Sequence, residues 1–264
     1  MVIRTSPRPA GSPCWIDLGS TDVARAKAFY GSLFGWDLRD GPPEAGGYVM
    51  CSVDGEVVAG IGPKIGPPEV PDVWLTYLAT PDADETAARI AAAGGHVLAE
   101  PFDVMTAGRM AVAADPAGAV FGLWQGRDHR GASLVQAAGA ICWCENLSRD
   151  FDGNKAFYRT VFGSEFDDMS GEGYKYASFR ADGPPLAGIG DPGSFAPEDM
   201  PAHWMTFFGA TDVDAAVTKV TELGGSILRP AWDTERGRMA MAGDDQGAAF
   251  ALLTVAESPA PADT

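Results

Sequence analysis

Alternation of apolar and polar positions predicts a strand over Cys14–Gly19, followed by a helix. Thr21 and Asp22 supply an N-cap, apolar side chains then recur at helical spacing, and Gly35 ends the helix. Three short strands follow, separated by turns rich in glycine and proline, so the first quarter of the chain reads β-α-β-β-β. These strands are expected at Trp36–Arg39, Tyr48–Val53 and Glu56–Gly62.

This order of elements recurs three more times along the chain. In each repeat a strand is followed by a helix with an aspartate at its start, and then by three further strands. The helices are expected at Asp82–Ala93, Asp152–Phe162 and Asp212–Leu223. The strands are expected at Val73–Ala79, His96–Glu100, Arg109–Ala114, Val120–Trp124, Ile141–Leu147, Glu165–Asp168, Tyr174–Arg180, Pro185–Ile189, Trp204–Ala210, Ile227–Arg229, Arg238–Ala242 and Ala249–Thr254.

The second half of the chain repeats the first in sequence as well as in element order. The stretch C-W-I-D-L with a later K-A-F-Y, which begins at Cys14, returns from Cys142 as C-W-C-E-N-L with a later K-A-F-Y. The motifs A-G-I-G, W-x-T, G-R-M-A and D-x-x-G-A-x-F also recur in the same order. A repeat of this length indicates a duplicated domain. We expect domains at 12–125 and 139–255, a polar linker at 126–138, and disordered segments before residue 12 and over 256–264.

The four β-α-β-β-β units, the opening C-W-I-D-L and F-Y-G-S-L-F-G stretches and the closing D-P-A-G-A-V-F-G-L-W stretch resemble the vicinal oxygen chelate (VOC) superfamily. That superfamily includes glyoxalase I, bleomycin-resistance proteins, fosfomycin-resistance enzymes and extradiol dioxygenases. The resemblance implies an α+β fold of two tandem VOC domains, each a pair of βαβββ units that forms one curved mixed sheet, or cup. Within the superfamily the chain is most similar to two-domain proteins called hydroxylases or glyoxalase-like proteins. Because one fold carries many reactions, the resemblance does not select one.

Metal-dependent members of this superfamily hold the ion with His, Gln or Glu side chains on the inner wall of the cup. Aligning the family's F-Y pair with Phe29 and Tyr30 places these positions at tryptophan, glycine or alanine in both halves. A site for a divalent ion needs several N, O or S donors, so we expect no metal and no cofactor. A shift of one residue would bring in His203, but its counterpart in the first half is Val73. The mapped positions are Trp15, Trp143, Trp74, Trp204, Gly122, Ala251, Ala59–Gly60 and Ala187–Gly188.

Tryptophans and carboxylates are expected on the cup walls instead. Side chains two residues apart on a strand share a face, so each wall tryptophan brings a second residue with it. Cys142 and Cys144 would then face the helices. The expected wall residues are Trp15 with Asp17, Trp74 with Thr76, Trp143 with Glu145, and Trp204 with Thr206, and Tyr48 and Tyr176 are placed to reach into the cups.

These wall residues support either of two interpretations. Indole rings with a carboxylate and a hydroxyl among them are typical of a pocket for a small aromatic molecule, but the same tryptophans could fill the cup as a dry core. Asp17 and Glu145 either face a ligand or pair with Arg109 and Arg238 of the G-R-M-A strands. In the first case the two arginines also become candidate ligand-binding residues.

Composition narrows the partners. The 264-residue chain carries a formal charge of −17, which disfavours nucleic acid and anionic membrane surfaces. We expect a cytoplasmic protein, because the N-terminus lacks the apolar region of a secretory signal and the four cysteines read as buried free thiols. The sequence leaves open a monomer or a homodimer.

The function favoured by the sequence is metal-free binding of an aromatic or polycyclic small molecule in tryptophan-lined cups. The alternative is a metal-independent enzyme in which Asp17 or Glu145 acts as a catalytic acid or base on a bound carbonyl compound. A metal-dependent dioxygenase or lyase is the third hypothesis, and it lacks the ligands it would need.

Overall fold

The computed structural model describes all residues except 5, 7, 67–68, 181–186, 194–195 and 257–264. In the first half, eight strands form one open mixed sheet in the order β3-β4-β5-β2-β6-β9-β8-β7. Its elements are β2 (Pro13–Ser20), α1 (Val23–Phe34), β3 (Asp37–Asp40), the 3-10 turn η1 (Pro43–Ala45), β4 (Val49–Val53), β5 (Glu56–Pro63), β6 (Val73–Ala79), α2 (Ala83–Ala92), β7 (His96–Val104), β8 (Gly108–Ala114) and β9 (Val120–Gly126).

The second half repeats this sheet in the order β12-β13-β14-β11-β15-β18-β17-β16. Each βαβββ unit supplies four consecutive strands of a sheet, so the predicted α+β fold of two tandem paired-unit domains is confirmed. The strand expected at Pro185–Ile189 begins outside the described residues. The elements are β11 (Ile141–Leu147), α3 (Phe151–Phe162), β12 (Phe166–Asp168), β13 (Tyr176–Phe179), β14 (Ala187–Gly190), β15 (His203–Ala210), α4 (Val213–Glu222), β16 (Ser226–Thr234), β17 (Gly237–Gly243) and β18 (Ala249–Thr254).

The first, second and fourth helices begin at the predicted aspartates, whereas α3 is capped by Asp150 and not by the expected Asp152. The side chains of Asp22, Asp82, Asp150 and Asp212 each accept a hydrogen bond from a backbone N–H in the first turn of a helix. Gly35 and Gly163 end α1 and α3 in the left-handed conformation, which glycine adopts without a Cβ penalty. Among the described residues no helix is long and apolar enough to cross a membrane.

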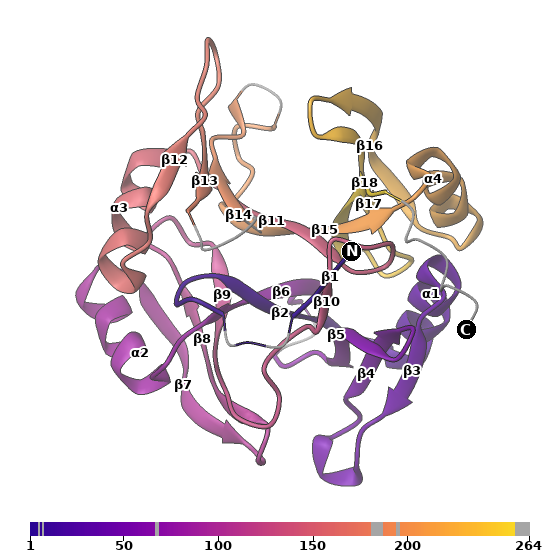
Figure 1. Ribbon diagram of the computed structural model, residues 1–264, viewed down its shortest axis with the longest axis horizontal. Coiled ribbons are helices and arrows are strands. Elements are labelled where there is room, and N and C mark those ends of the chain that lie inside the picture. Colours follow the sequence, from indigo (N-terminus) through magenta and orange to yellow (C-terminus); the bar gives the residue numbers. More distant parts are fainter. Residues whose placement is uncertain (5, 7, 67–68, 181–186, 194–195, 257–264) are drawn as a thin grey trace.

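The two sheets lie back to back, with their concave faces directed away from each other (Figure 1). The central strands β6 and β15 face each other across this contact, where the hydroxyls of Thr76 and Thr206 lie 3.5 Å apart. Helices α1 and α4 flank the contact on one side, and α2 and α3 flank it on the other (Figure 1). The shared core therefore lies between the sheets, and each cup opens on an outer face.

Two segments expected to be loose are instead built into the fold. Strand β1 (Val2–Ile3) pairs with β10 (Leu134–Val135), and β10 also pairs in parallel with β11. The expectation of a disordered start is therefore wrong for the described residues before residue 12. The segment 126–138, which was expected to be a polar linker, packs into the fold. Four of its apolar residues are buried: Ala132, Leu134, Val135 and Ala137.

Candidate functional site

The register between β2 and β6 decides which side chains face the first cup. Trp15 lies opposite Tyr77, Asp17 opposite Leu75, and Leu18 opposite Trp74. Residues opposite each other in an antiparallel pair share a face, so Tyr77 enters the cup beside Trp15. Trp74 has the opposite orientation: its Nε1 donates to the Tyr30 hydroxyl over 2.9 Å on the helix side.

The second half has the same register. Trp143 lies opposite Phe207, Cys144 opposite Thr206, and Asn146 opposite Trp204. The expectation that Trp74, Thr76, Trp204 and Thr206 line the cups is therefore wrong. A slip of one residue moves a whole strand to the other face, and the W-x-T motif carries no signal that fixes its face. All four side chains are buried between the domains instead.

In the first cup a hydrogen-bonded aromatic cluster surrounds Asp17. The Trp15 Nε1 donates to the Tyr48 hydroxyl over 2.9 Å, and the Tyr48 hydroxyl donates to Asp17 Oδ2 over 3.1 Å. The Tyr77 hydroxyl donates to the same carboxylate oxygen, also over 3.1 Å. Tyr77 was missed because the predicted register placed it on the other face.

Glycines make room for these tyrosine rings. A Cβ on Gly60 would lie 1.9 Å from the Tyr48 hydroxyl oxygen, and a Cβ on Gly122 would lie 2.1 Å from a Tyr77 ring carbon. The Tyr48 ring therefore lies flat against the backbone at Gly60, and the Tyr77 ring at Gly122, because neither glycine has a side chain. The resemblance placed two ligand positions of the metal-dependent proteins here, and tyrosine rings now cover both.

The segment between the domains covers part of the first cup. The His129 ring meets the Trp15 ring edge-on, with the ring centroids 4.4 Å apart, and lies 5.6 Å from the Trp124 ring. The His129 carbonyl accepts a hydrogen bond from Trp124 Nε1 over 2.8 Å. Neither Trp124 nor His129 was among the predicted wall residues, yet both pack onto the aromatic cluster.

Burial shifts the titration of the groups in this cup. Desolvation raises the pKa of Asp17 to about 7, and the hydrogen bonds from Tyr77 and Tyr48 limit the rise. Burial lowers the pKa of His129 to about 4. His129 Nε2 is buried, and no described residue forms a hydrogen bond with it. The cup therefore favours the uncharged form of both side chains.

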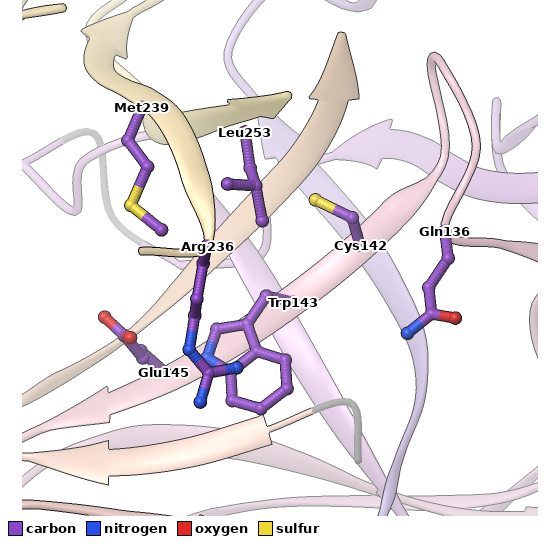
Figure 2. Close-up of a pocket in the computed structure, with 7 residues that line it drawn as sticks. All are labelled: Gln136, Cys142, Trp143, Glu145, Arg236, Met239 and Leu253. Atoms are coloured by element: carbon purple, nitrogen blue, oxygen red, sulfur yellow. The ribbon is translucent and has the colours of Figure 1, made fainter. Parts of the chain in front are cut away.

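The second cup contains a cavity of about 330 Å³ (Figure 2). This volume falls in the usual range of small-molecule sites. The cavity combines an indole, apolar side chains, one carboxyl group and one guanidinium. It is lined by Gln136, Cys142, Trp143, Glu145, Arg236, Met239 and Leu253.

Trp143 and Glu145 repeat the local geometry of Trp15 and Asp17. The Trp143 Nε1 donates to the Tyr176 hydroxyl over 2.8 Å, and the Tyr176 hydroxyl donates to Glu145 Oε1 over 2.8 Å. A Cβ on Gly188 would lie 2.3 Å from that hydroxyl oxygen, so Tyr176 lies across the strand as Tyr48 does. The inward direction predicted for the tryptophan, the acid and the tyrosine is confirmed in both cups.

Besides Glu145 in place of Asp17 and Ala251 in place of Gly122, three substitutions distinguish the second cup from the first. Aligned on the repeat, Phe207 stands where the first half has Tyr77, and Leu253 stands where it has Trp124. Arg236 replaces Ala107 immediately before the G-R-M-A motif. The second cup therefore has one smaller side chain on its wall, loses one hydroxyl and gains a cation.

Arg236 was not predicted as a cup residue, although the change from Ala107 to Arg236 beside a repeated motif is visible in the sequence. Its guanidinium lies over the Trp143 ring, 4.7 Å from the ring centroid, and 5.9 Å from the centroid of Tyr176. Its Nη2 donates to the sulfur of Met169 over 3.3 Å. Burial raises the pKa of Glu145, while the Tyr176 hydrogen bond and the Arg236 charge oppose the rise.

Local backbone irregularities bring in two further residues. A bulge between Ile141 and Trp143 turns Cys142 into the cup, so its expected position on the helix side is wrong, whereas Cys144 lies in the core between the domains. Gln136 has a left-handed backbone with φ 55°, and its side chain lines the cavity (Figure 2). No sequence pattern marks either feature.

The arginines of the G-R-M-A strands lie outside the cups. Arg109 pairs with Asp84 over 2.7 Å and with Asp103 over 3.2 Å. Arg238 makes the equivalent pairs with Asp214 and Asp233. The hypothesis that they pair with Asp17 and Glu145 is therefore wrong.

The donor set does not fit a metal of the kind the superfamily implies. Across the described ranges, no three His, Cys, Asp or Glu side chains come together in a group that could hold an ion. His203 is at the start of β15, where its Nδ1 lies 2.9 Å from the Pro201 carbonyl oxygen. We therefore derive no chemical step through a metal.

Comparison with known proteins agrees with the architecture. The model of the Glyoxalase/Bleomycin resistance protein/Dioxygenase superfamily matches residues 14–123 and 141–252. The protein named "Putative glyoxylase CFP32" of Mycobacterium tuberculosis (strain CDC 1551 / Oshkosh) is 39% identical over 257 residues, which cover 95% of this chain and 96% of that protein. "Anthracycline biosynthesis protein DauV" of Streptomyces sp. (strain C5) is 37% identical over 271 residues, with 96% and 97% covered.

Among solved structures, the Mn(II)-bound glyoxalase from Novosphingobium aromaticivorans superposes with a TM-score of 0.65 at 16% identity. The superposition covers 96% of this chain and 85% of that one. At this identity the likeness concerns the fold alone.

Proposed function

Because the chain belongs to the Glyoxalase/Bleomycin resistance protein/Dioxygenase superfamily, we propose that it uses the second of its two cups to bind a planar aromatic small molecule, without a metal ion. The observation that carries this proposal is the cavity beside Trp143. An indole face gives flat apolar area, and aromatic ligands stack on it or meet its edge. Met239 and Leu253 add apolar wall, while Gln136 and Glu145 supply the few polar groups that orient a ligand.

The relatives support the chemical class. Two proteins from Streptomyces that are each 37% identical to this chain are named for anthracycline biosynthesis, and an anthracycline contains fused planar rings. A flat polycyclic ligand suits a cavity that is walled on one side by an indole. The mycobacterial relative is named for a different activity, so the names alone do not choose between binding and catalysis.

We assign the first cup a mainly structural role. Its aromatic side chains hydrogen-bond to one another and to Asp17, and His129 packs on Trp15 from above. A ligand would have to displace these contacts, whereas the second cup already has a cavity.

Calorimetric titration with anthraquinone-2-carboxamide, an uncharged planar probe, tests this proposal. Trp143→Leu should weaken binding at least tenfold, because it removes the indole face. Trp15→Leu is the matched control, since Trp15 and Trp143 make the same hydrogen bond to a tyrosine, and it should leave the affinity within about twofold. No binding to the wild type, or an equal loss in both variants, would refute the assignment of the second cup.

Proton transfer by Glu145 is the second candidate function. Glu145 is the carboxyl group that lines the cavity, and burial raises its pKa toward the range in which general acids and bases operate. In heavy water, NMR would follow the exchange of the acidic C–H protons of 2-tetralone, a bicyclic ketone. Exchange accelerated by the wild type and lost in Glu145→Gln, with binding retained, would show an enzyme rather than a binder. The same role for Asp17 stays a prediction, although two tyrosine hydroxyls already occupy one of its oxygens.

A further inference from the structure

We propose that the second cup selects planar aromatic compounds that carry an ionised acidic oxygen, a carboxylate or a phenolate, and that Arg236 binds this oxygen. The inference rests on the proposed function of this cup and adds a charge requirement to it. The first cup lacks this feature, because Ala107 stands at the corresponding position.

The electrostatic contacts of Arg236 differ from those of its neighbour Arg238. Arg238 is fixed by two carboxylates, at 2.7 Å from Asp214 and 3.0 Å from Asp233. Among the ion pairs of the described residues, none includes Arg236, which instead donates to the thioether sulfur of Met169. A thioether sulfur is a weak hydrogen-bond acceptor. An ionised oxygen of a ligand would therefore displace it and form a stronger hydrogen bond with Arg236.

The position of Arg236 places this charge at the ring-binding face. Its guanidinium lies over the indole of Trp143, the surface on which a planar ligand would stack (Figure 2). Its side chain is exposed, so it is free to move from the ring face to the ring edge as a ligand enters. An arginine in this position pairs with a planar carboxylate through two parallel hydrogen bonds.

The other groups that face the cavity add little repulsion toward an anion. Glu145 comes from β11, where it accepts a hydrogen bond from the Tyr176 hydroxyl, and burial raises its pKa, which disfavours the negative charge that would repel the ligand. Cys142, from the same strand, stays a neutral thiol because burial raises its pKa. Met239 and Leu253, from β17 and β18, are uncharged, and Gln136 offers an amide. Arg236 is thus the positive charge of this lining.

A pair of matched probes tests the requirement. Anthraquinone-2-carboxylate and anthraquinone-2-carboxamide share their rings and nearly their shape, and differ in charge. Calorimetry at pH 6 should show the carboxylate binding the wild type at least tenfold more tightly than the carboxamide. Arg236→Gln should reduce this ratio to about one, mainly by weakening the carboxylate. Arg236→Lys should keep part of the preference, because it keeps the charge but not the two parallel donors.

Arg238→Gln is the matched control, because it removes an arginine two residues away that lies outside the cup. It should leave the ratio unchanged. Equal binding of the two probes by the wild type, tighter binding of the carboxamide, or a ratio that survives Arg236→Gln would overturn the charge requirement while the proposed aromatic binding stands. Failure of both probes to bind would overturn the proposed function, and this inference with it.

Discussion

The hydroxyl of Tyr30, in the first domain, donates a hydrogen bond of 3.0 Å to Asp244 Oδ2 in the second domain. The same hydroxyl accepts a hydrogen bond from Trp74 Nε1 over 2.9 Å. Asp244 Oδ1 accepts two backbone N–H groups of its own turn, from Gln246 and Ala248. One buried carboxylate therefore shapes the turn before β18 and joins the two domains.

The duplication produces a reciprocal bond between Tyr158 and Asp115, with an O–O distance of 3.1 Å. Trp204 Nε1 donates to the Tyr158 hydroxyl over 3.0 Å, as Trp74 does to Tyr30. Asp115 Oδ2 also accepts from the side-chain amides of Asn146 and Asn154. The two interdomain bonds thus have the same geometry, but two asparagine side chains also donate to the acceptor oxygen of Asp115, whereas Tyr30 is the one side-chain donor among the described residues to Asp244 Oδ2.

This inequality predicts different costs for two matched changes. Tyr30→Phe leaves Asp244 Oδ2 and Trp74 Nε1 without a partner from the described residues, and should lower the free energy of unfolding by about 2–3 kcal/mol. Tyr158→Phe also removes the acceptor of Trp204 Nε1, but it should cost less, about 1–2 kcal/mol, because Asn146 and Asn154 still donate to Asp115. Urea unfolding of both variants measures the difference. An equal or larger loss in Tyr158→Phe would contradict this account.

The predictions from sequence succeeded where a local pattern has a local cause. Aspartate caps, helix-ending glycines and turn glycines gave the order of elements, and the repeat gave two domains. Period-two alternation placed Trp15 with Asp17 and Trp143 with Glu145 correctly, because the two residues of each pair lie on the same strand. The register between β2 and β6 is a long-range property, so the faces of Trp74 and Trp204 did not follow from it.

The D-x-x-G-A-x-F motif shows a second limit. From the sequence it marks a turn before the closing strand, and the turn is present at both copies. The aspartate of this motif also binds a helix of the other domain. Asp115 binds Tyr158 of α3, 43 residues later in sequence, and Asp244 binds Tyr30 of α1, 214 residues earlier, so no local pattern reveals this role. Similarly, the bulge that turns Cys142 inward and the left-handed backbone of Gln136 arise from strand packing that no local pattern encodes.

Gly122 should resist substitution because the Tyr77 ring lies across it. A Cβ at this position would be 2.1 Å from the ring, so Gly122→Ala should destabilise the protein by about 1–3 kcal/mol. The hydroxyl bond to Asp17 holds the ring in place. Tyr77→Phe removes that anchor, and the second half already combines an alanine, Ala251, with a phenylalanine, Phe207.

Combining the two changes tests whether the Tyr77 hydroxyl fixes the position of its ring. Gly122→Ala combined with Tyr77→Phe should lose less stability than the sum of the two single changes, because an unanchored ring is free to turn away from the added methyl group. Thermal unfolding of the four proteins completes the cycle. Additive losses would mean that the hydroxyl of Tyr77 does not determine the position of its ring.

Ligand binding should not depend on a divalent ion. The possible metal donors of the cavity are Glu145, Cys142 and the neutral amide of Gln136, and within the described part of the chain no three His, Cys, Asp or Glu side chains form a group that could hold an ion. Elemental analysis of untagged protein should find well below one equivalent of zinc, iron, nickel or manganese per chain. Dialysis against a chelator should leave the affinity for anthraquinone-2-carboxamide unchanged. A full equivalent of metal whose removal abolishes binding would refute the metal-free proposal.

The raised pKa of Asp17 should make its contribution to the free energy of unfolding decrease as pH rises. Its pKa in the folded protein is raised from 3.8 to about 7, chiefly by burial. Between these two values the unfolded chain has lost the proton and the folded protein still holds it, so each increase in pH favours unfolding. Above pH 7 both states are ionised, and the folded protein bears the full cost of a buried charge.

Asp17→Asn should remove this cost while it keeps an oxygen that accepts hydrogen bonds from Tyr48 and Tyr77. The variant should be more stable than the wild type by roughly 1–3 kcal/mol at pH 8, a figure below the full shift because the carboxyl is partly accessible to water. The gain should shrink steadily toward pH 4, because the difference in ionisation between the folded and the unfolded state disappears as the pH approaches the unfolded pKa of 3.8. Asp103→Asn is the control of opposite sign, because Arg109 and Arg127 lower the pKa of Asp103, so its ionised form favours folding. Urea unfolding of the three proteins at pH 5, 6, 7 and 8 measures the trend, and a gain for Asp17→Asn that does not vary with pH would show that the charge of Asp17 is not what the cup disfavours.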